Sequence, residues 1–286
     1  MTFSPTDAAF EGFRLTRREP KMIIALALVY AVTSIIFLAV AYYPLGQMMK
    51  LMGAMSSGVE PSEAEVLTFM KSYGQLIAIS ALPSLIINSI VQTAVVRAVI
   101  NPAANRYGFL RLGKDELRVF ATNLLVGLII GFAALIGFGV VGVLFGFGAQ
   151  GMPLLIFVGG ILMLAVIAGM AWLAIKLCLS VPITFTEKRI GIQRSFAVTK
   201  GHFWPLVGMV LLAMVLSIAV SFLGSMVTTP LTMVTGGLSV LAGETGLSAG
   251  VISALFVWSI ISAVLGAAQM LIVYAPLSAA WQSLKG

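Results

Sequence analysis

Charge is scarce in this sequence. Only 9% of its 286 residues are Asp, Glu, Lys or Arg, whereas 60% are hydrophobic and the mean hydropathy is +1.08. Soluble domains carry about 25% charged residues, so the composition excludes that class and predicts an all-α, polytopic membrane protein. We expect a single membrane domain over residues 1–286, with a cytoplasmic interfacial segment at 1–21 and a six-helix bundle with loops at 22–281.

Residues that commonly carry catalysis are also rare. The chain has one cysteine, Cys178, and one histidine, His202, and it lacks HExxH, GxSxG, P-loop and paired-cysteine motifs. Its acidic residues lie outside the apolar stretches. We therefore expect no enzymatic activity, no catalytic residue, no cofactor, no metal site and no nucleic-acid partner.

Six apolar stretches are long enough to cross a bilayer, which takes about 20 residues. The first is not a cleavable signal peptide, because no small-x-small cleavage site follows it. Before the second, "SEAE" at 62–65 is a capping box that predicts a helix start. The six predicted spans lie near 22–43, 73–96, 119–145, 153–181, 206–227 and 251–274.

The basic residues are distributed unevenly between the loops. Of the 17 Lys and Arg residues, 15 lie in the N-terminal segment, the second and fourth connections or the C-terminal tail. Short loops rich in Lys and Arg stay on the cytoplasmic side of a membrane. The distribution predicts that both termini are cytoplasmic.

The segment before the first span has the pattern of an interfacial helix. Ser4 is placed to cap a helix that begins at Pro5. Such a helix lies on the membrane surface with its aromatic side chains toward lipid and its cations beside the headgroups. The aromatic face would hold Phe3, Phe10 and Phe13, flanked by Arg14 and Arg17.

A related segment, "RSFAVTKGHFW" at 194–204, precedes the fifth span, and a third, "YGFLRLGKDELRVF" at 107–120, precedes the third span. The third segment has an apolar face of Phe109, Leu112 and Phe120 that Glu116 interrupts. The recurrence predicts three helical hairpins, each preceded by a basic interfacial segment. The residues expected to contact lipid headgroups are Arg14, Arg17, Arg194, Lys200, His202 and Trp204.

The segment "FTEKRIGIQRSFAVTKGHFWPLV" at 185–207 follows Pro182 and leads into an apolar span. It resembles the six-helix membrane domain attached to some bacterial glycerophosphoryl diester phosphodiesterases, and related stand-alone inner-membrane proteins. The resemblance implies a bacterial cytoplasmic membrane protein with a scaffolding or membrane-embedding role. This sequence holds no counterpart of the phosphodiesterase catalytic domain, so the resemblance implies no such activity here.

Two predicted spans carry polar residues along one helical face. The second has Ser84, Asn88 and Gln92, and the sixth has Ser259, Ser262, Gly266 and Gln269. In lipid such faces must turn toward protein or a water-filled cavity. They predict either hydrogen bonds between helices or a substrate path, which would be lined by Ser84, Asn88, Gln92 and Gln269.

Glycines and isolated cations add two further expectations. One face of the third span holds four glycines, Gly127, Gly131, Gly142 and Gly146. This face predicts a close-packed neighbouring helix, either in this chain or in another subunit. Arg97 and Lys176 stand near cytoplasmic ends of spans, where they would either extend to the membrane surface or form a paired functional charge.

These features favour a structural, scaffolding or accessory protein of the bacterial inner membrane. Its predicted partners are membrane lipids, anionic ones above all, and other membrane proteins. The alternative is a small transporter or lipid-handling permease with a polar path between the second and sixth spans. An intramembrane enzyme is disfavoured by the missing acid, base and metal ligands.

Overall fold

The chain is helical wherever its fold is described. The computed structural model describes residues 4–56, 62–104, 107–234 and 249–285, and no strand occurs within them. The long helices are α3 (Pro20–Ser56), α4 (Glu63–Ile100), α5 (Lys114–Ala149), α6 (Pro153–Leu177), α9 (Phe203–Val234) and α11 (Ala249–Lys285). The short ones are α1 (Pro5–Ala9), α2 (Glu11–Arg18), η1 (Pro102–Ala104), η2 (Tyr107–Phe109), α7 (Ser180–Glu187) and α8 (Ile192–Thr199).

The all-α class is confirmed for the described residues. Six of their helical segments are long and apolar enough to cross a membrane, which is compatible with a multi-pass membrane protein. Most extend beyond the predicted apolar stretches. The helix α4 begins at the predicted capping box, where the Ser62 backbone donates to Glu65 at 2.8 Å and the Glu65 backbone donates to Ser62 at 3.4 Å. At the other end of the chain, α11 continues through Pro276.

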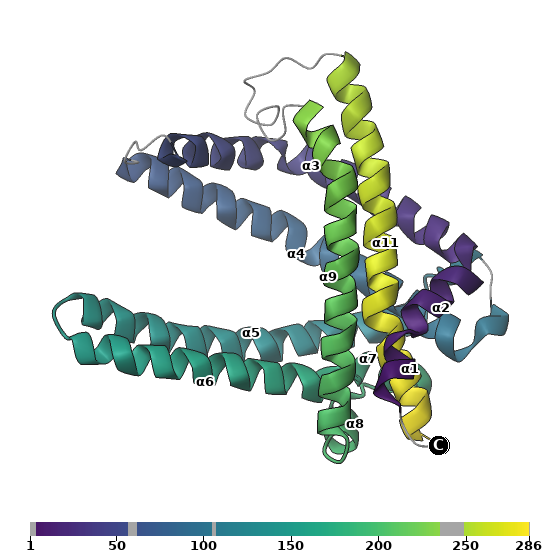
Figure 1. Cartoon of the computed structure of the whole chain (residues 1–286). Coiled ribbons are helices and arrows are strands. Elements are labelled where there is room, and N and C mark those ends of the chain that lie inside the picture. The colour runs from purple at the N-terminus through teal and green to yellow at the C-terminus, as the bar shows by residue number, and fades with distance from the viewer. Residues whose placement is uncertain (1–3, 57–61, 105–106, 235–248, 286) are drawn as a thin grey trace.

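The long helices lie side by side in consecutive pairs, α3 with α4, α5 with α6 and α9 with α11 (Figure 1). The pairs meet at one end of the molecule and diverge from it, so they do not close into a bundle along their length. Only 6% to 22% of the most apolar window of each spanning segment is buried within the protein. Most of the apolar surface of these helices is therefore left for lipid or for other proteins.

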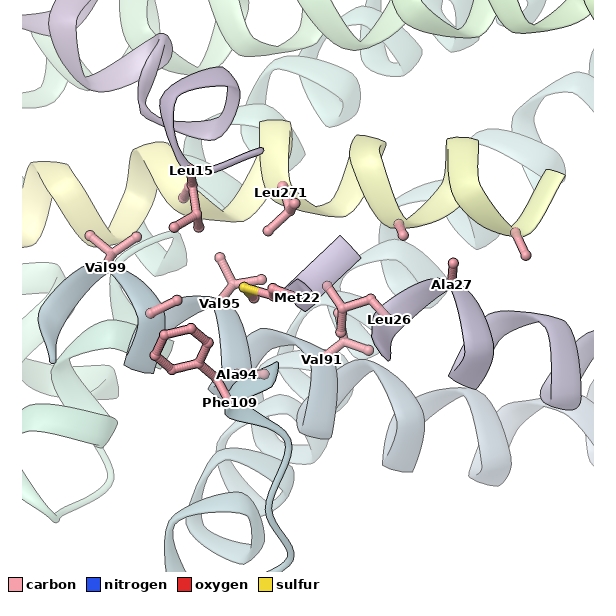
Figure 2. Close-up of a cluster of buried hydrophobic side chains, with 14 residues drawn as sticks. Leu15, Met22, Leu26, Ala27, Val91, Ala94, Val95, Val99, Phe109 and Leu271 are labelled. Carbon is pink, nitrogen blue, oxygen red and sulfur yellow. The ribbon is translucent and has the colours of Figure 1, made fainter. Parts of the chain in front are cut away.

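Two clusters of buried apolar side chains hold the pairs together, and we call them the hub. The first joins α2, α3, α4, η2 and α11, and Figure 2 shows Leu15, Met22, Val95, Phe109 and Leu271 pointing toward one another. The second joins α1, α6, α7, α9 and α11 through residues that include Leu179, Leu206 and Trp281. Every helix pair thus contributes to the hub.

The N-terminal segment is part of the hub and not only a surface helix. Ser4 caps α1 as predicted, and its hydroxyl accepts a hydrogen bond from the Asp7 backbone at 3.4 Å. The inward face, however, consists of Ala8, Ala9, Gly12 and Leu15, which are buried, while Phe10 is 43% exposed. Phe3 lies outside the described residues.

The third predicted interfacial segment does not form a surface helix. Gly108 and Phe109 both adopt left-handed backbone conformations, with φ of 64° and 66°, and the Phe109 side chain is fully buried in the hub. Leu112, which was expected on the same apolar face, is 85% exposed. The prediction failed because the aromatic residue fills the first cluster instead of facing lipid.

The predicted packing face of α5 also differs from what we observe. A Cβ atom added at Gly127, Gly131, Gly142 or Gly146 would meet no described atom within 4 Å, so no helix of the described chain packs there. The glycines that do face a neighbour are Gly137, against Val166, and Gly148, against Ile156. The alternative, that a helix of another subunit packs against these four glycines, stays a prediction.

Gly12→Ala tests the close approach of α2 to α11. A Cβ atom there would lie 2.6 Å from the Ile272 Cα and 2.7 Å from the Leu271 carbonyl oxygen, so the backbones must separate. We expect a loss of about 1 to 3 kcal/mol in stability, measured as a lower thermal unfolding temperature in detergent. The matched control is Gly131→Ala, which gains the same helix propensity in open space. Equal unfolding temperatures for Gly12→Ala and Gly131→Ala would contradict the close packing of α2 against α11.

Candidate functional site

A buried ion pair lies beside the first cluster of the hub, next to Phe109. Arg97 in α4 is 5% exposed, and its Nη2 donates to Glu116 Oε1 in the first turn of α5 at 2.5 Å. Its Nη1 donates to the Phe109 carbonyl oxygen at 2.6 Å, and the guanidinium carbon lies 5.6 Å from the ring centroid of Phe185 in α7. Of the two alternatives for Arg97, extension to the membrane surface is wrong, and the charge is paired inside the protein as the other alternative required.

The backbone of η2, which contacts the ion pair through the Phe109 carbonyl oxygen, is unusual. A left-handed conformation at a bulky residue costs about 1 to 3 kcal/mol, so it persists only where its surroundings compensate. At Phe109 the ring is buried in the first cluster, and the carbonyl oxygen accepts from Arg97. Arg97 in α4 is thereby bonded both to Glu116 in α5 and to Phe109 between the two helices.

A small, mainly apolar cavity lies between α4, α5, α6, α7 and α11. Its volume is about 180 Å³, and its polar walls are Gln92, Asn123, Tyr274 and Ser278. The Asn123 amide donates to Ser89 Oγ at 2.9 Å and to Gln92 Oε1 at 3.0 Å, and Gln92 is also hydrogen-bonded to Tyr274. Cys178 lies in the wall.

The structure does not bring together the four residues of the predicted polar path. Gln92 lines the cavity, but the Gln269 amide donates to Ser221 Oγ of α9 at 2.6 Å. Ser84 lines a different space, a groove of about 570 Å³ between α3 and α4. Asn88 is half-buried and forms no hydrogen bond with any residue that the structure describes.

The two polar faces therefore act in part as contacts between helices. Besides Gln269 and Ser221, the hydroxyls of Ser34 in α3 and Ser259 in α11 lie 3.5 Å apart. Asn123 and Tyr274 were missed as cavity residues. Asn123 is an isolated amide in an apolar span, which is a detectable feature, whereas Tyr274 near a span end has the pattern of an ordinary interfacial aromatic residue.

The groove between α3 and α4 is mainly apolar, with hydroxyls at several points of its wall. It is lined by Tyr30, Thr33, Ser34, Phe37, Ser80 and Ser84, among others. The Tyr30 hydroxyl is buried and has no hydrogen-bond partner in the described protein. A groove of this kind would be filled by lipid chains in a membrane.

The residues predicted to contact headgroups lie on the surface of the hub end. Arg14, Arg17, Arg194, Lys200, His202 and Trp204 are all exposed. Two of these cations also pair within the protein, Arg14 with Asp7 at 3.1 Å and Arg194 with Glu187 at 3.5 Å. Hydrogen bonds from Ser4 and Arg14 lower the pKa of the Asp7 carboxyl below its usual range.

Lys176, near the end of α6, is buried like Arg97 and was not expected to be. It is 8% exposed, and its Nζ lies 5.9 Å from the ring centroid of Trp172 and 5.7 Å from that of Phe203. Its carbonyl oxygen accepts from Ser195 Oγ in α8 at 2.7 Å. The expectation that this side chain extends to the membrane surface is wrong as well.

Comparisons with known proteins add no assignment. No family model, no curated protein and no solved structure matches the chain. Among the described residues, no group of three or more His, Cys, Asp and Glu side chains is placed to hold a metal ion.

Arg97→Met tests the ion pair. The substitution leaves the Glu116 carboxylate buried without its cation, and breaking a buried pair in this way costs about 3 to 5 kcal/mol. We expect a large fall in the thermal unfolding temperature in detergent. Replacing both partners, as Arg97→Met with Glu116→Leu, removes the unpaired charge and restores a substantial part of that loss. A double variant no more stable than the single one would refute the pairing.

Proposed function

We propose that this is a multi-pass protein of the bacterial inner membrane with a structural, scaffolding or accessory role, and that it binds anionic lipid at its hub end. This proposal rests on the exposed cations and aromatic side chains that lie together at that end, such as Arg17, Lys200 and Trp204. Trp204 is 78% exposed. Cations beside aromatic residues at the ends of apolar helices favour anionic headgroups.

The uncovered surfaces support the scaffolding part of the proposal. The helix pairs diverge, and their outer faces carry large exposed apolar residues such as Phe132, Phe157 and Phe222, which are 65%, 68% and 65% exposed. In a membrane these faces contact lipid or other membrane proteins. The open glycine face of α5 suits a helix from such a partner, because small residues allow close approach.

The proposal includes the location in the bacterial inner membrane and the orientation of the chain in it. The resemblance of residues 185–207 to the membrane domain of bacterial phosphodiesterases supports a bacterial inner-membrane protein. The distribution of Lys and Arg supports cytoplasmic termini, and the consecutive helix pairs support three inserted hairpins.

Single-cysteine labelling checks the orientation. In a background with Cys178→Ala, we expect Ser57→Cys to react with an impermeant maleimide in intact cells. The variants Lys114→Cys, Arg189→Cys and Lys285→Cys should react only after the cells are opened. Labelling of residue 114 in intact cells would contradict the proposed orientation and indicate the opposite one.

Neutralising surface cations tests the proposed lipid contacts. For Arg194→Gln combined with Lys200→Gln, we expect retention of phosphatidylglycerol or cardiolipin to fall in native mass spectrometry, since each exposed cation contributes about 1 kcal/mol of attraction. The six apolar helices should still insert, because they bury far more apolar surface than α8 does. Wild-type protein that retains anionic and zwitterionic lipids equally would refute the proposal.

The cavity and the groove favour one second candidate, a lipid-handling permease or small transporter. The amides of Gln92 and Asn123 give the cavity part of a polar wall, and the groove between α3 and α4, of about 570 Å³, has the mainly apolar lining that an acyl chain requires. Transfer of fluorescent lipid between leaflets of proteoliposomes would favour this candidate over a scaffold. Binding without transfer would favour the scaffold.

A further inference from the structure

Two cationic side chains are buried in the described part of the chain, and only one of them has a counter-ion there. Arg97 has the Glu116 carboxylate beside it, whereas Lys176 forms no ion pair, and its Nζ makes no hydrogen bond to any described residue. The nearest acidic residue along the chain, Glu187, pairs with Arg194, and Asp115 pairs with Lys188 at 2.9 Å and with Arg118. Lys176 is therefore a buried cation without a counter-ion from the described chain.

Aromatic rings meet only part of what this ammonium group requires. Contacts with rings such as Trp172 and Phe203 stabilise a cation by about 0.5 to 2 kcal/mol. A lysine ammonium has three N–H donors, however, and a charge held in a poorly hydrated place is costly unless an anion or another acceptor pairs with it. The position favours a ligand that brings negatively charged oxygen atoms.

We infer that Lys176 binds the phosphate of an anionic phospholipid, held between α6, α8 and α9. The N-terminus of α9 begins at Phe203, and the first amides of this 32-residue helix have no acceptor within it, so they add positive potential beside Nζ. Lys200, in the turn between α8 and α9, adds a second, exposed cation for the rest of the headgroup.

A lipid fits this place better than free phosphate does. Trp172 and Trp204 are 49% and 78% exposed beside the site, and α6 and α9 continue as apolar helices away from it. A phosphate at Lys176 would leave its acyl chains along these helices. The inference rests on the proposed function, since it names the side chain that holds an anionic lipid most tightly.

The experiment measures lipid retention by the full-length protein with native mass spectrometry, using phosphatidylglycerol and phosphatidylcholine. We expect wild type to retain one phosphatidylglycerol at low lipid concentration. Lys176→Gln should weaken that retention about tenfold or more, since it removes one partner of a buried charge contact. Lys176→Arg keeps the charge and should retain the lipid. The matched control is Lys71→Gln, because Lys71 is an exposed lysine near the start of α4, at the end of that helix opposite to Arg97.

A measurement on unaltered protein covers the case in which Lys176→Gln does not fold. Reductive methylation of Lys176, followed by peptide mass spectrometry, should be several-fold slower in phosphatidylglycerol than in phosphatidylcholine. Equal rates in the two lipids would overturn the inference. Equal protection by inorganic phosphate in phosphatidylcholine would overturn the assignment to a lipid.

The outcomes also separate this inference from the proposed function. Wild type without any preference for phosphatidylglycerol would refute both. A wild-type preference that survives in a folded Lys176→Gln variant would refute only the role of Lys176, and the exposed cations would then carry the lipid contacts.

Discussion

The buried pairing of Arg97 with Glu116 is the interaction on which the hub depends. It joins the end of α4 to the start of α5, and through the Phe109 carbonyl it also holds the segment between them. The ring of Phe185 covers the guanidinium from α7. Because a charge inside an apolar protein requires a partner at a defined place, this pair specifies one relative position for these elements. Nonpolar contacts alone would allow many.

Beyond the hub, the helices need little from one another. Each helix satisfies its own backbone hydrogen bonds, so a pair is free to diverge from its neighbours without leaving unpaired polar groups in lipid. The small buried fraction of the spanning segments fits this condition. It also explains why glycine has different effects along the chain: Gly12 lies against the backbone of α11, whereas Gly131 faces open space.

Polar groups within the apolar helices fall into two kinds. Some join helices, as Gln269 does with Ser221, and these need no further function. Others line a space, as the amides of Gln92 and Asn123 do at the cavity, or hold a charge without a counter-ion from the described chain, as at Lys176. The second kind is where a ligand has something to bind, and it is the basis of both the lipid proposal and its alternative.

Much of the secondary structure was determined by local sequence. Apolar stretches of sufficient length predicted the six spanning helices, and the caps at Ser4 and Ser62 formed as expected, because both depend on residues within one or two turns of each other. The exposure of Arg17, Lys200 and Trp204 also followed from the chain's own pattern of charge and aromatic residues.

Tertiary structure alone decided which faces meet. Apolar side chains pack against lipid about as well as against each other, so hydrophobicity along a spanning helix carries little information about its neighbours. For this reason the sequence left open whether the glycine face of α5 meets a helix of this chain, and whether Gln269 bonds to another helix or lines a path with Gln92; in the structure that face meets no described helix and Gln269 bonds to Ser221. Glu116 lies 19 residues after Arg97, and Trp172 and Phe203 come from different helices. Only folding brings these groups to the two buried cations, because burial makes a charge depend on whatever lies beside it in space.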